Sequence, residues 1–366
     1  MKKNIFICHR PYQILRSCDM IARSYKDGYH NVLYSFDVKL SKTNQFQKFE
    51  VYDIFYTYFD EVTELQRVVT PSVRALPEFY RVCKNKRKEY LPLVVRHLDA
   101  ENVFFFADCE LEVELLVGLF REKCPATLNS ILVDEGLVTY SDSDHQYSWK
   151  RRMWLKMFST IVGLKYFNYV WRYGISNLYN KSLANNVDKA IYFHPPVDLL
   201  PPLSEKTCSD IRSKITSKHV PGYSKPHFIY ADTYEKTFEE DVPVIELLRE
   251  VLQRNNMDFY IKLHPQQNEE QYRKHFGDNI LLEKGVPVEL FFSKKAIIGG
   301  TISSSLFNAS LQGYKAVDFS YLFPAESRKL WVQKPITEQF DWIEVSKIYD
   351  IETFEMLIRN FMKQQF

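Results

Sequence analysis

The sequence lacks the patterns that mark several common classes of protein. Its six cysteines show no CxxC spacing and several lie in apolar patterns, so neither disulfides nor a zinc site is expected. No stretch approaches the roughly 18–20 apolar residues of a membrane span. The 48 Lys and Arg residues are balanced by 46 Asp and Glu residues, which argues against a general nucleic-acid-binding protein. No internal repeat or low-complexity tract is present.

The first residues also lack the features of a secretory signal. The sequence Met1-Lys2-Lys3-Asn4 leads directly into a short apolar pattern at 5–8, without a long apolar run or a small-residue cleavage site. We therefore expect a cytoplasmic protein.

The composition is that of a globular chain. With 366 residues, of which 45% are hydrophobic and 26% charged, the chain suits two domains of ordinary size. Aromatic residues make up 15%, which exceeds what a core alone normally uses. We expect part of this surplus to line a sugar site or a membrane contact.

Patterns typical of strands and helices alternate through the first half of the sequence. Short apolar runs predict strands, and apolar residues at helical spacing predict the helices between them. The strands are expected at 5–8, 31–36, 102–107 and 130–133, and the helices at 12–25 and 110–120. This alternation predicts a parallel sheet covered by helices.

A polar, proline-rich stretch separates this half from a second alternating set. The second set has strands expected at 227–231, 259–262, 295–298 and 316–319, and helices at 244–255, 303–312 and 351–364, with Gly313 as a helix stop. The pattern predicts an α/β fold of two Rossmann-like domains, with ligands in a cleft outside the carboxyl ends of the strands. The expected divisions are a domain at 1–195, a linker at 196–226, a nucleotide-binding domain at 227–345 and a terminal helix at 346–366. Packing of that helix back on the N-terminal domain is one arrangement we consider.

A histidine follows the predicted strand at 259–262. Lys262-Leu263-His264-Pro265 ends this strand, and Pro265 prevents its continuation, so His264 is expected on a loop at the carboxyl edge of the sheet. An imidazolium there could hold a phosphate and donate a proton as a nucleotide leaves. A lone His-Pro pair more often only caps a turn, which is our interpretation of 194–195.

A glycine- and hydroxyl-rich run lies between the strand at 295–298 and the next helix. Glycines permit close backbone approach, and hydroxyls with free N–H groups at a helix start form an anion site. Ordinary N-capping needs only one of these serines, so the run predicts phosphate binding. It reads Gly299-Gly300-Thr301-Ile302-Ser303-Ser304-Ser305. Glu289, at the start of a short apolar helix at 288–292, is either a helix-dipole partner or an acceptor for both ribose hydroxyls.

Acidic residues follow the predicted strand at 130–133. Asp134-Glu135-Gly136 ends this strand, and the glycine allows a sharp turn that would face a carboxylate toward the cleft. Such a carboxylate can deprotonate a sugar hydroxyl. Acid-glycine turns are common, so this motif is weak by itself. The Asp-Ser-Asp run at 142–144 is similar to a DxD metal motif, but its polar surroundings favour a solvated loop.

The span 149–173 combines basic and aromatic residues and contains no acidic residue. This composition suits a surface helix on anionic lipid headgroups, which would attach the protein peripherally to the inner face of the cell membrane. A core helix with snorkelling lysines explains the composition equally well.

Taken together, these motifs resemble those of the bacterial sialyltransferases with the two-Rossmann GT-B fold, which include glycosyltransferase family 52, the polysialyltransferases and family 80. These families share an acidic-acidic-glycine, a His-Pro and a paired-serine motif, in the order found here. Family 80 also has a nucleotide-binding lysine, a ribose-binding glutamate and a Gly-Gly-x-x-Ser-Ser stretch, which Lys262, Glu289 and 299–304 match. The opening at 7–13 is similar to the first strand and loop of family 52 and polysialyltransferase chains.

The resemblance implies an inverting sialyltransferase that uses CMP-sialic acid and a galactose-type hydroxyl of a bacterial capsule, lipooligosaccharide or O-antigen. It implies His264 as the acid, and Glu135, Asp134 or Asp232 as the base. It implies no metal and no cofactor. The implied donor-binding residues are Lys262, Pro265, Glu289, Gly300, Thr301, Ser303, Ser304 and Ser305.

Two other interpretations stay open on the sequence alone. A CDP-glycerol-type glycerophosphotransferase of a teichoic-acid-like pathway also has a two-Rossmann fold with His-Pro and paired-serine features. A non-catalytic glycan-binding module with a degenerate site is the other. The retained acidic, histidine and serine residues argue against that module.

Overall fold

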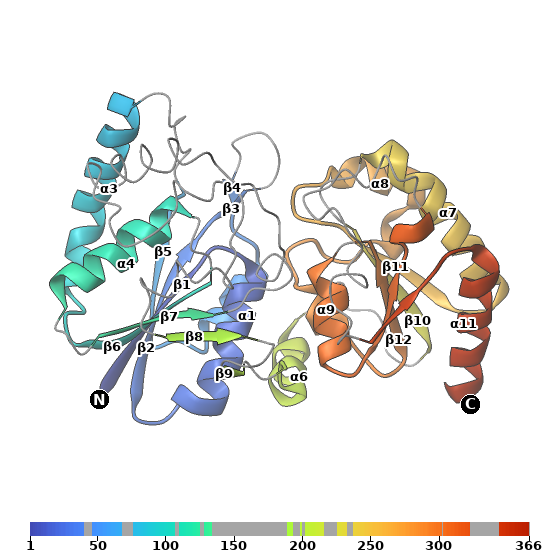
Figure 1. Cartoon of the computed structure of the whole chain (residues 1–366), viewed down its shortest axis with the longest axis horizontal. Helices are drawn as coiled ribbons and strands as arrows, with labels where there is room; N and C mark the ends of the chain where they lie inside the picture. Colours follow the sequence, from blue (N-terminus) through green and yellow to red (C-terminus); the bar gives the residue numbers. More distant parts are fainter. Residues whose placement is uncertain are drawn as a thin grey trace, which may run out of the picture. The chain divides into compact units, whose positions relative to one another are not determined.

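The computed structural model contains two α/β units, each built on a parallel sheet (Figure 1). It describes residues 1–39, 46–67, 76–106, 110–124, 128–133, 189–192, 198–199, 202–215, 225–232, 237–301, 303–322 and 344–365. Unit 1 comprises Met1–Asp37 and Phe55–Pro201, and unit 2 comprises Val38–Ile54 and Pro202–Phe366. A segment from the first half of the sequence therefore packs with the second half.

Unit 1 has a seven-stranded sheet in the order β5-β2-β1-β6-β7-β8-β9, and all neighbouring strands are parallel. The chain begins in the middle, moves outward to β5, and returns to the other side of β1. The switch point, at which the strand order reverses, therefore lies between β1 and β6. The strands are β1 (Lys2–Cys8), β2 (Tyr29–Phe36), β5 (Glu61–Leu65), β6 (Ala100–Phe105), β7 (Asn129–Val133), β8 (Lys189–Tyr192) and β9 (Asp198–Leu199).

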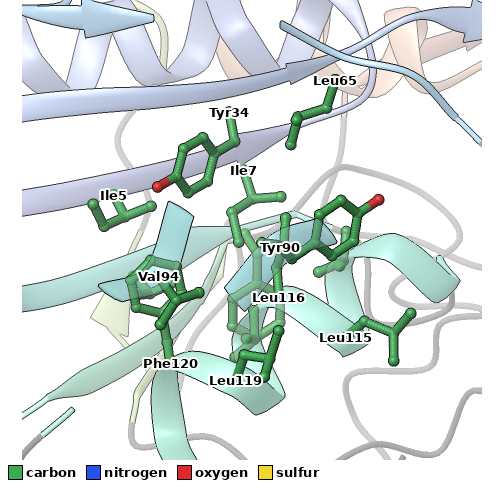
Figure 2. Packing of buried hydrophobic residues seen from close by; sticks show 14 of the residues in the cluster. Ile5, Ile7, Tyr34, Leu65, Tyr90, Val94, Leu115, Leu116, Leu119 and Phe120 are labelled. Atoms are coloured by element: carbon green, nitrogen blue, oxygen red, sulfur yellow. The ribbon is translucent and has the colours of Figure 1, made fainter. Parts of the chain in front are cut away.

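Alternate residues of β1 face opposite sides of this sheet. Ile5 and Ile7 pack into the core beneath helices α3 (Leu76–Val95) and α4 (Leu111–Lys123), which Figure 2 shows. Phe6 stacks instead on Phe104 of β6, with ring centroids 4.7 Å apart. The Cys8 thiol lies 3.4 Å from the Ser17 hydroxyl of α1 (Pro11–Met20), which continues as a π-helix, η1 (Ile21–Tyr25). Helices therefore cover both faces.

Unit 2 has a five-stranded parallel sheet in the order β11-β10-β12-β13-β14. Its switch point lies between β10 and β12. The strands are β10 (His227–Ala231), β11 (Asp258–Lys262), β12 (Ala296–Gly300), β13 (Lys315–Asp318) and β14 (Val345–Lys347). The helices are α6 (Glu205–Lys214), α7 (Phe238–Arg254), α8 (Glu269–Phe276), α9 (Ser304–Leu311) and α11 (Ile351–Gln365), with 3-10 turns η5 (Asp278–Ile280), η6 (Val288–Phe291) and η7 (Ser320–Leu322). Helix α2 (Val51–Tyr56) and the hairpin of β3 (Val38–Lys39) and β4 (Phe46–Gln47) complete the described elements.

Aromatic side chains fix α11 to the sheet of unit 2. Phe354 of α11 lies edge-on to Phe228 of β10 and to Phe319, with ring centroids 5.6 and 5.2 Å apart. Ile358 and Phe361, further along the helix, join the same core. Burying each such side chain contributes roughly 1.5–3 kcal/mol, so the C-terminal helix is an integral part of unit 2.

The predicted strands and helices are present, with ends that differ by a few residues. The expected stop at Gly313 is confirmed: its φ is +74°, and Tyr314 N–H donates to the Ala309 carbonyl at 2.9 Å, as in a Schellman cap. The expected linker at 196–226 contains more structure than its prolines suggested, since β9 and α6 lie within it. The two-Rossmann α/β fold expected from the sequence is the fold observed.

Candidate functional site

The candidate donor site lies at the carboxyl edge of the unit 2 sheet. Lys262, the last residue of β11, is 7% exposed, and its ammonium donates to the Lys284 carbonyl at 2.8 Å and to the Leu263 carbonyl at 3.1 Å. Burial lowers the pKa of Lys262 to about 8, against the opposing effect of the Glu289 carboxylate. An ammonium has three N–H donors, so one remains for a ligand oxygen.

The loop at 284–285, whose Lys284 carbonyl accepts from Lys262, packs on the segment Val38–Ile54 from the first half of the sequence. A Cβ on Gly285 would lie 2.4 Å from the Phe49 ring, so only glycine allows this packing. The neighbouring Lys284 donates to the Gln267 carbonyl at 2.7 Å, which ties the same loop to the one after His264. Neither Lys284 nor Phe49 was expected from the sequence.

His264 lies on the loop after β11, as predicted, and is partly exposed. The Gln266 N–H donates to its Nδ1 at 3.2 Å, and the Gln267 N–H donates to its carbonyl at 2.9 Å. When the Nδ1 lone pair accepts this bond, Nε2 is the ring nitrogen that carries the proton. The role of the ring as an imidazolium stays a prediction.

Glu289 lies on η6 and is 6% exposed. Its Oε1 accepts a hydrogen bond of 2.8 Å from Asn308 Nδ2 of α9. It is also close enough to Lys262 to raise the pKa of that ammonium. Asn308 was not predicted as part of the site, because a polar residue within a short helix carries no sequence signal for a partner 19 positions away.

The hydroxyl run surrounds the start of α9. Ser303 is the N-cap, and its Oγ accepts from the Ser305 N–H at 3.3 Å. Thr301 and Ser303 are buried, whereas Ser304 and Ser305 are partly exposed. N-capping alone therefore explains one serine. Anion binding by the other hydroxyls and by the start of α9 stays a prediction.

The two glycines before this run have a packing role that the sequence did not indicate, and the approach of a phosphate at Gly300 stays a prediction. Both lie within β12, where a Cβ on Gly299 would lie 2.1 Å from the Phe228 ring. A Cβ on Gly300 would lie 2.6 Å from the Ala231 carbonyl oxygen of β10. Close packing inside unit 2 therefore accounts for both glycines, without a ligand.

Of the three expected candidates for the base, one lies among the described residues. Asp232 directly follows β10 and is 6% exposed, and its N–H donates to the Lys262 carbonyl at 3.0 Å. Asp134 and Glu135 fall outside the described residues, although β7 ends at Val133, directly before them. The run at 142–144 and the span 149–173 also fall outside.

The structure brings part of the predicted donor set together. The charges of Lys262 and Glu289 interact, and Glu289 bonds to Asn308 of α9, which begins at the paired serines. Pro265 follows His264 on the loop after β11. Within the described part of the chain, no cluster of three or more His, Cys, Asp or Glu side chains could hold a metal ion. The helices described there include none long and apolar enough to cross a membrane.

Two Rossmann-type parallel sheets, with polar residues gathered at the carboxyl edge of unit 2, define a GT-B fold. Among solved structures, a UDP-N-acetylglucosamine 2-epimerase from Listeria monocytogenes is 12% identical, and the alignment covers 99% of this chain and 88% of that one with a TM-score of 0.52. The GT-B domain of a sialyltransferase from Photobacterium damselae is also 12% identical, over 95% of this chain and 100% of that chain, with a TM-score of 0.48. At such identities the first likeness shows the fold alone, and no curated protein matches.

The family is shown by the sequence itself. Residues 4–312, which are most of the chain, match the sequence profile of the alpha-2,8-polysialyltransferase family. The chain belongs to this family. It is a glycosyltransferase, and the resemblance to polysialyltransferases stated from its motifs is confirmed at this level.

Proposed function

We propose that this protein transfers sialic acid from CMP-sialic acid, with inversion, to a terminal sugar hydroxyl of a bacterial surface glycan. The observation that supports the proposal is that the Glu289 carboxylate interacts electrostatically with the Lys262 ammonium and accepts a hydrogen bond from Asn308 of α9. This arrangement brings a buried cation, a buried carboxylate and a helix start to one edge of a sheet, in a chain of the alpha-2,8-polysialyltransferase family. A cytidine monophosphate needs these three groups: a cation and N–H donors for its phosphate, and a carboxylate for its ribose.

In the proposed reaction, the bond between sialic acid and CMP breaks ahead of attack, so negative charge develops on the departing phosphate. The remaining Lys262 N–H, the His264 Nε2–H and the hydroxyls at 303–305 would stabilise this charge as fixed donors. Glu289 would accept both ribose hydroxyls. No metal takes part in this proposal, and activity is expected to survive excess EDTA.

The base that takes the proton of the acceptor hydroxyl is proposed to be Glu135, with Asp134 and Asp232 as the alternatives. The Asp232 backbone N–H donates to the Lys262 carbonyl, and Asp232→Asn keeps this bond. Glu135→Gln and Asp232→Asn therefore test the two carboxylates as bases. The variant that lacks the base should keep its affinity for CMP and lose sugar transfer. Substitution of a residue that binds the donor should lower both CMP affinity and transfer.

Donor hydrolysis and transfer assays test the proposed function. Purified protein is incubated with CMP-sialic acid or CDP-glycerol, together with a fluorescent lactoside or an α-2,8-linked sialyl oligomer, and products are read by mass spectrometry. We expect release of CMP only from CMP-sialic acid and growth of an acceptor by sialic acid units. Turnover of CDP-glycerol alone would overturn the proposal in favour of a glycerophosphotransferase.

We also propose that the span 149–173 attaches the protein peripherally to anionic membranes, which would bring it to a lipid-linked acceptor. Each Lys or Arg near such a surface contributes about 1 kcal/mol. Replacing Lys150, Arg151, Arg152 and Lys156 by Gln should release the protein from phosphatidylglycerol vesicles at low salt. Wild-type protein that ignores these vesicles would end this proposal.

A further inference from the structure

Unit 1 carries a buried polar cluster at its own switch point. His9 directly follows β1 and is 1% exposed, and its ring stacks on Phe36 with centroids 4.3 Å apart. The backbone N–H of His9 donates at 2.6 Å to Oε1 of Gln13. Gln13 lies in the first turn of α1 and is also 1% exposed. In parallel α/β sheets, ligands bind outside the carboxyl ends of the strands at this reversal of strand order.

An ion pair lies beside the histidine. Arg67, just after β5, bonds to Glu110, which precedes α4 on the other side of the switch point. Burial raises the pKa of Glu110, but the hydrogen bond and charge of Arg67, together with the nearby charge of Arg10, lower it below its ordinary value. The side chains of Arg67 and Glu110 remain 15% and 20% exposed, so this pair forms the accessible part of the cluster.

The buried atoms of the cluster have unused hydrogen-bonding capacity. Among the described residues, nothing bonds to Nδ1 or Nε2 of His9 or to Nε2 of Gln13. Leaving a buried polar group unsatisfied costs about 1–3 kcal/mol, which favours a role for these atoms beyond folding. Burial and the positive charge of Arg67 lower the pKa of His9 to about 3. The neutral ring therefore offers one donor and one acceptor, and the Gln13 amide adds donors.

This set of groups matches a hydroxyl, which donates one hydrogen bond and accepts others. A ligand cation is disfavoured by Arg10 and Arg67, whose charges already lower the pKa of His9. We propose that His9 and Gln13, beside the Arg67–Glu110 pair, form a binding site for hydroxyl groups of the acceptor sugar. This inference rests on the proposed function, because it assigns the acceptor side of the same reaction.

Two variants remove the hydrogen-bonding atoms and retain the packing. His9→Phe keeps a ring against Phe36, and Gln13→Glu keeps the Oε1 that accepts from the His9 N–H. Gln253→Glu, on the exposed face of α7, is the matched control. Each lost hydrogen bond is worth roughly 2–12-fold in affinity. We therefore expect acceptor KM to rise about tenfold in His9→Phe and less in Gln13→Glu, with kcat and CMP-sialic acid hydrolysis unchanged.

A second measurement keeps this test separate from that of the proposed function. With [15N]histidine-labelled protein and no donor present, the His9 ring signals should shift when the lactoside or the α-2,8-linked sialyl trimer is added. Because His9 is 1% exposed, a sugar can reach its ring only when the surrounding residues open locally. The 15N signals of the His9 ring would also report such an opening. A shift of the His9 signals in a protein that does not turn over CMP-sialic acid would support the sugar-binding site and reject the proposed sialyltransferase activity. Unchanged acceptor KM in both variants, or a His9 signal that ignores both sugars, would reject the site.

Discussion

The carboxyl edges of the two sheets differ in how their buried polar groups are satisfied. In unit 2, the Lys262 ammonium bonds to two carbonyls, the Glu289 carboxylate bonds to Asn308, and Ser303 caps α9. In unit 1, the His9 ring nitrogens and the Gln13 amide have no hydrogen-bond partner among the described residues. Both edges lie at a switch point, so the fold alone does not explain the difference.

The difference suggests two modes of ligand recognition. At the proposed donor edge, Lys262 and Glu289 are preorganised, since the protein already holds both groups and a nucleotide would only add to them. At the proposed acceptor edge, His9 and Gln13 have hydrogen-bonding atoms that no described residue satisfies, and a sugar would satisfy them on binding. Preorganised groups stabilise a transition state without reorganisation, whereas groups that gain partners from the ligand mainly affect affinity. Changes at the proposed donor edge should therefore affect kcat and CMP binding, and changes at the proposed acceptor edge should affect acceptor KM.

The largest effect is expected from His264→Ala. A positioned acid-base group is worth roughly 10²–10⁴-fold in rate, so kcat should fall by that factor while acceptor KM changes little. The melting temperature should stay near that of the wild type, because a partly exposed loop residue contributes little packing. His275→Ala is the control, since that exposed histidine pairs with Glu246 and packs on Phe238 and Phe276, away from the proposed donor residues. Near-wild-type kcat in His264→Ala would remove this residue from the mechanism.

Glu289→Gln should weaken CMP binding next most strongly. The glutamine keeps an oxygen for Asn308 but loses the charge, and a hydrogen bond to a charged group is worth about 1.5–3 kcal/mol. We therefore expect roughly 10–100-fold weaker binding by calorimetry. The exposed Glu250→Gln on α7 should bind CMP normally. Equal CMP affinity in both variants would show that Glu289 serves the fold and not the ribose.

His9→Phe should change how stability depends on acid. The folded-state pKa of His9 is about 3, below the unfolded value near 6.5, so the unfolded chain takes up a proton first as pH falls. Between pH 7 and pH 5 this disfavours the folded wild type by about 2 kcal/mol. His9→Phe has no ring that takes up this proton, so its free energy of unfolding, measured in urea, should fall less between pH 7 and pH 5. Identical losses in both proteins would contradict the neutral, buried ring on which the unit 1 site depends.

The sequence predicted local features better than long-range pairings. The strand at 227–231 and the stop at Gly313 follow from apolar runs and helix-end chemistry, and both are confirmed. Helix α3 was missed because its charged middle obscures the few buried side chains spread over 20 residues. The loop position of His264 was predictable, because proline ends a strand.

The site's partners were not predictable in the same way. The contact of Glu289 with Asn308 depends on how η6 packs against α9, and the packing of Phe49 on Gly285 joins residues from different halves of the sequence. Glycines illustrate the same limit. The pair at 299–300 indicated phosphate approach, which stays a prediction, and the sequence did not show that neighbouring rings and a carbonyl also require both glycines.

The smallest expected effect concerns pH and the donor edge. Burial lowers the pKa of Lys262 to about 8, so above that pH the folded protein loses a proton that the unfolded chain keeps up to its ordinary value. Folding stability from this group therefore rises as pH increases from about 8 toward 10.4. CMP affinity should do the opposite, because a phosphate favours the ammonium form. We expect calorimetry to give about tenfold weaker binding at pH 9 than at pH 7, with proton uptake visible when the buffer is changed. Lys262→Met should bind CMP weakly at both values and show neither the pH dependence nor the uptake. A wild-type affinity that stays constant from pH 7 to pH 9 would mean that the phosphate does not contact Lys262.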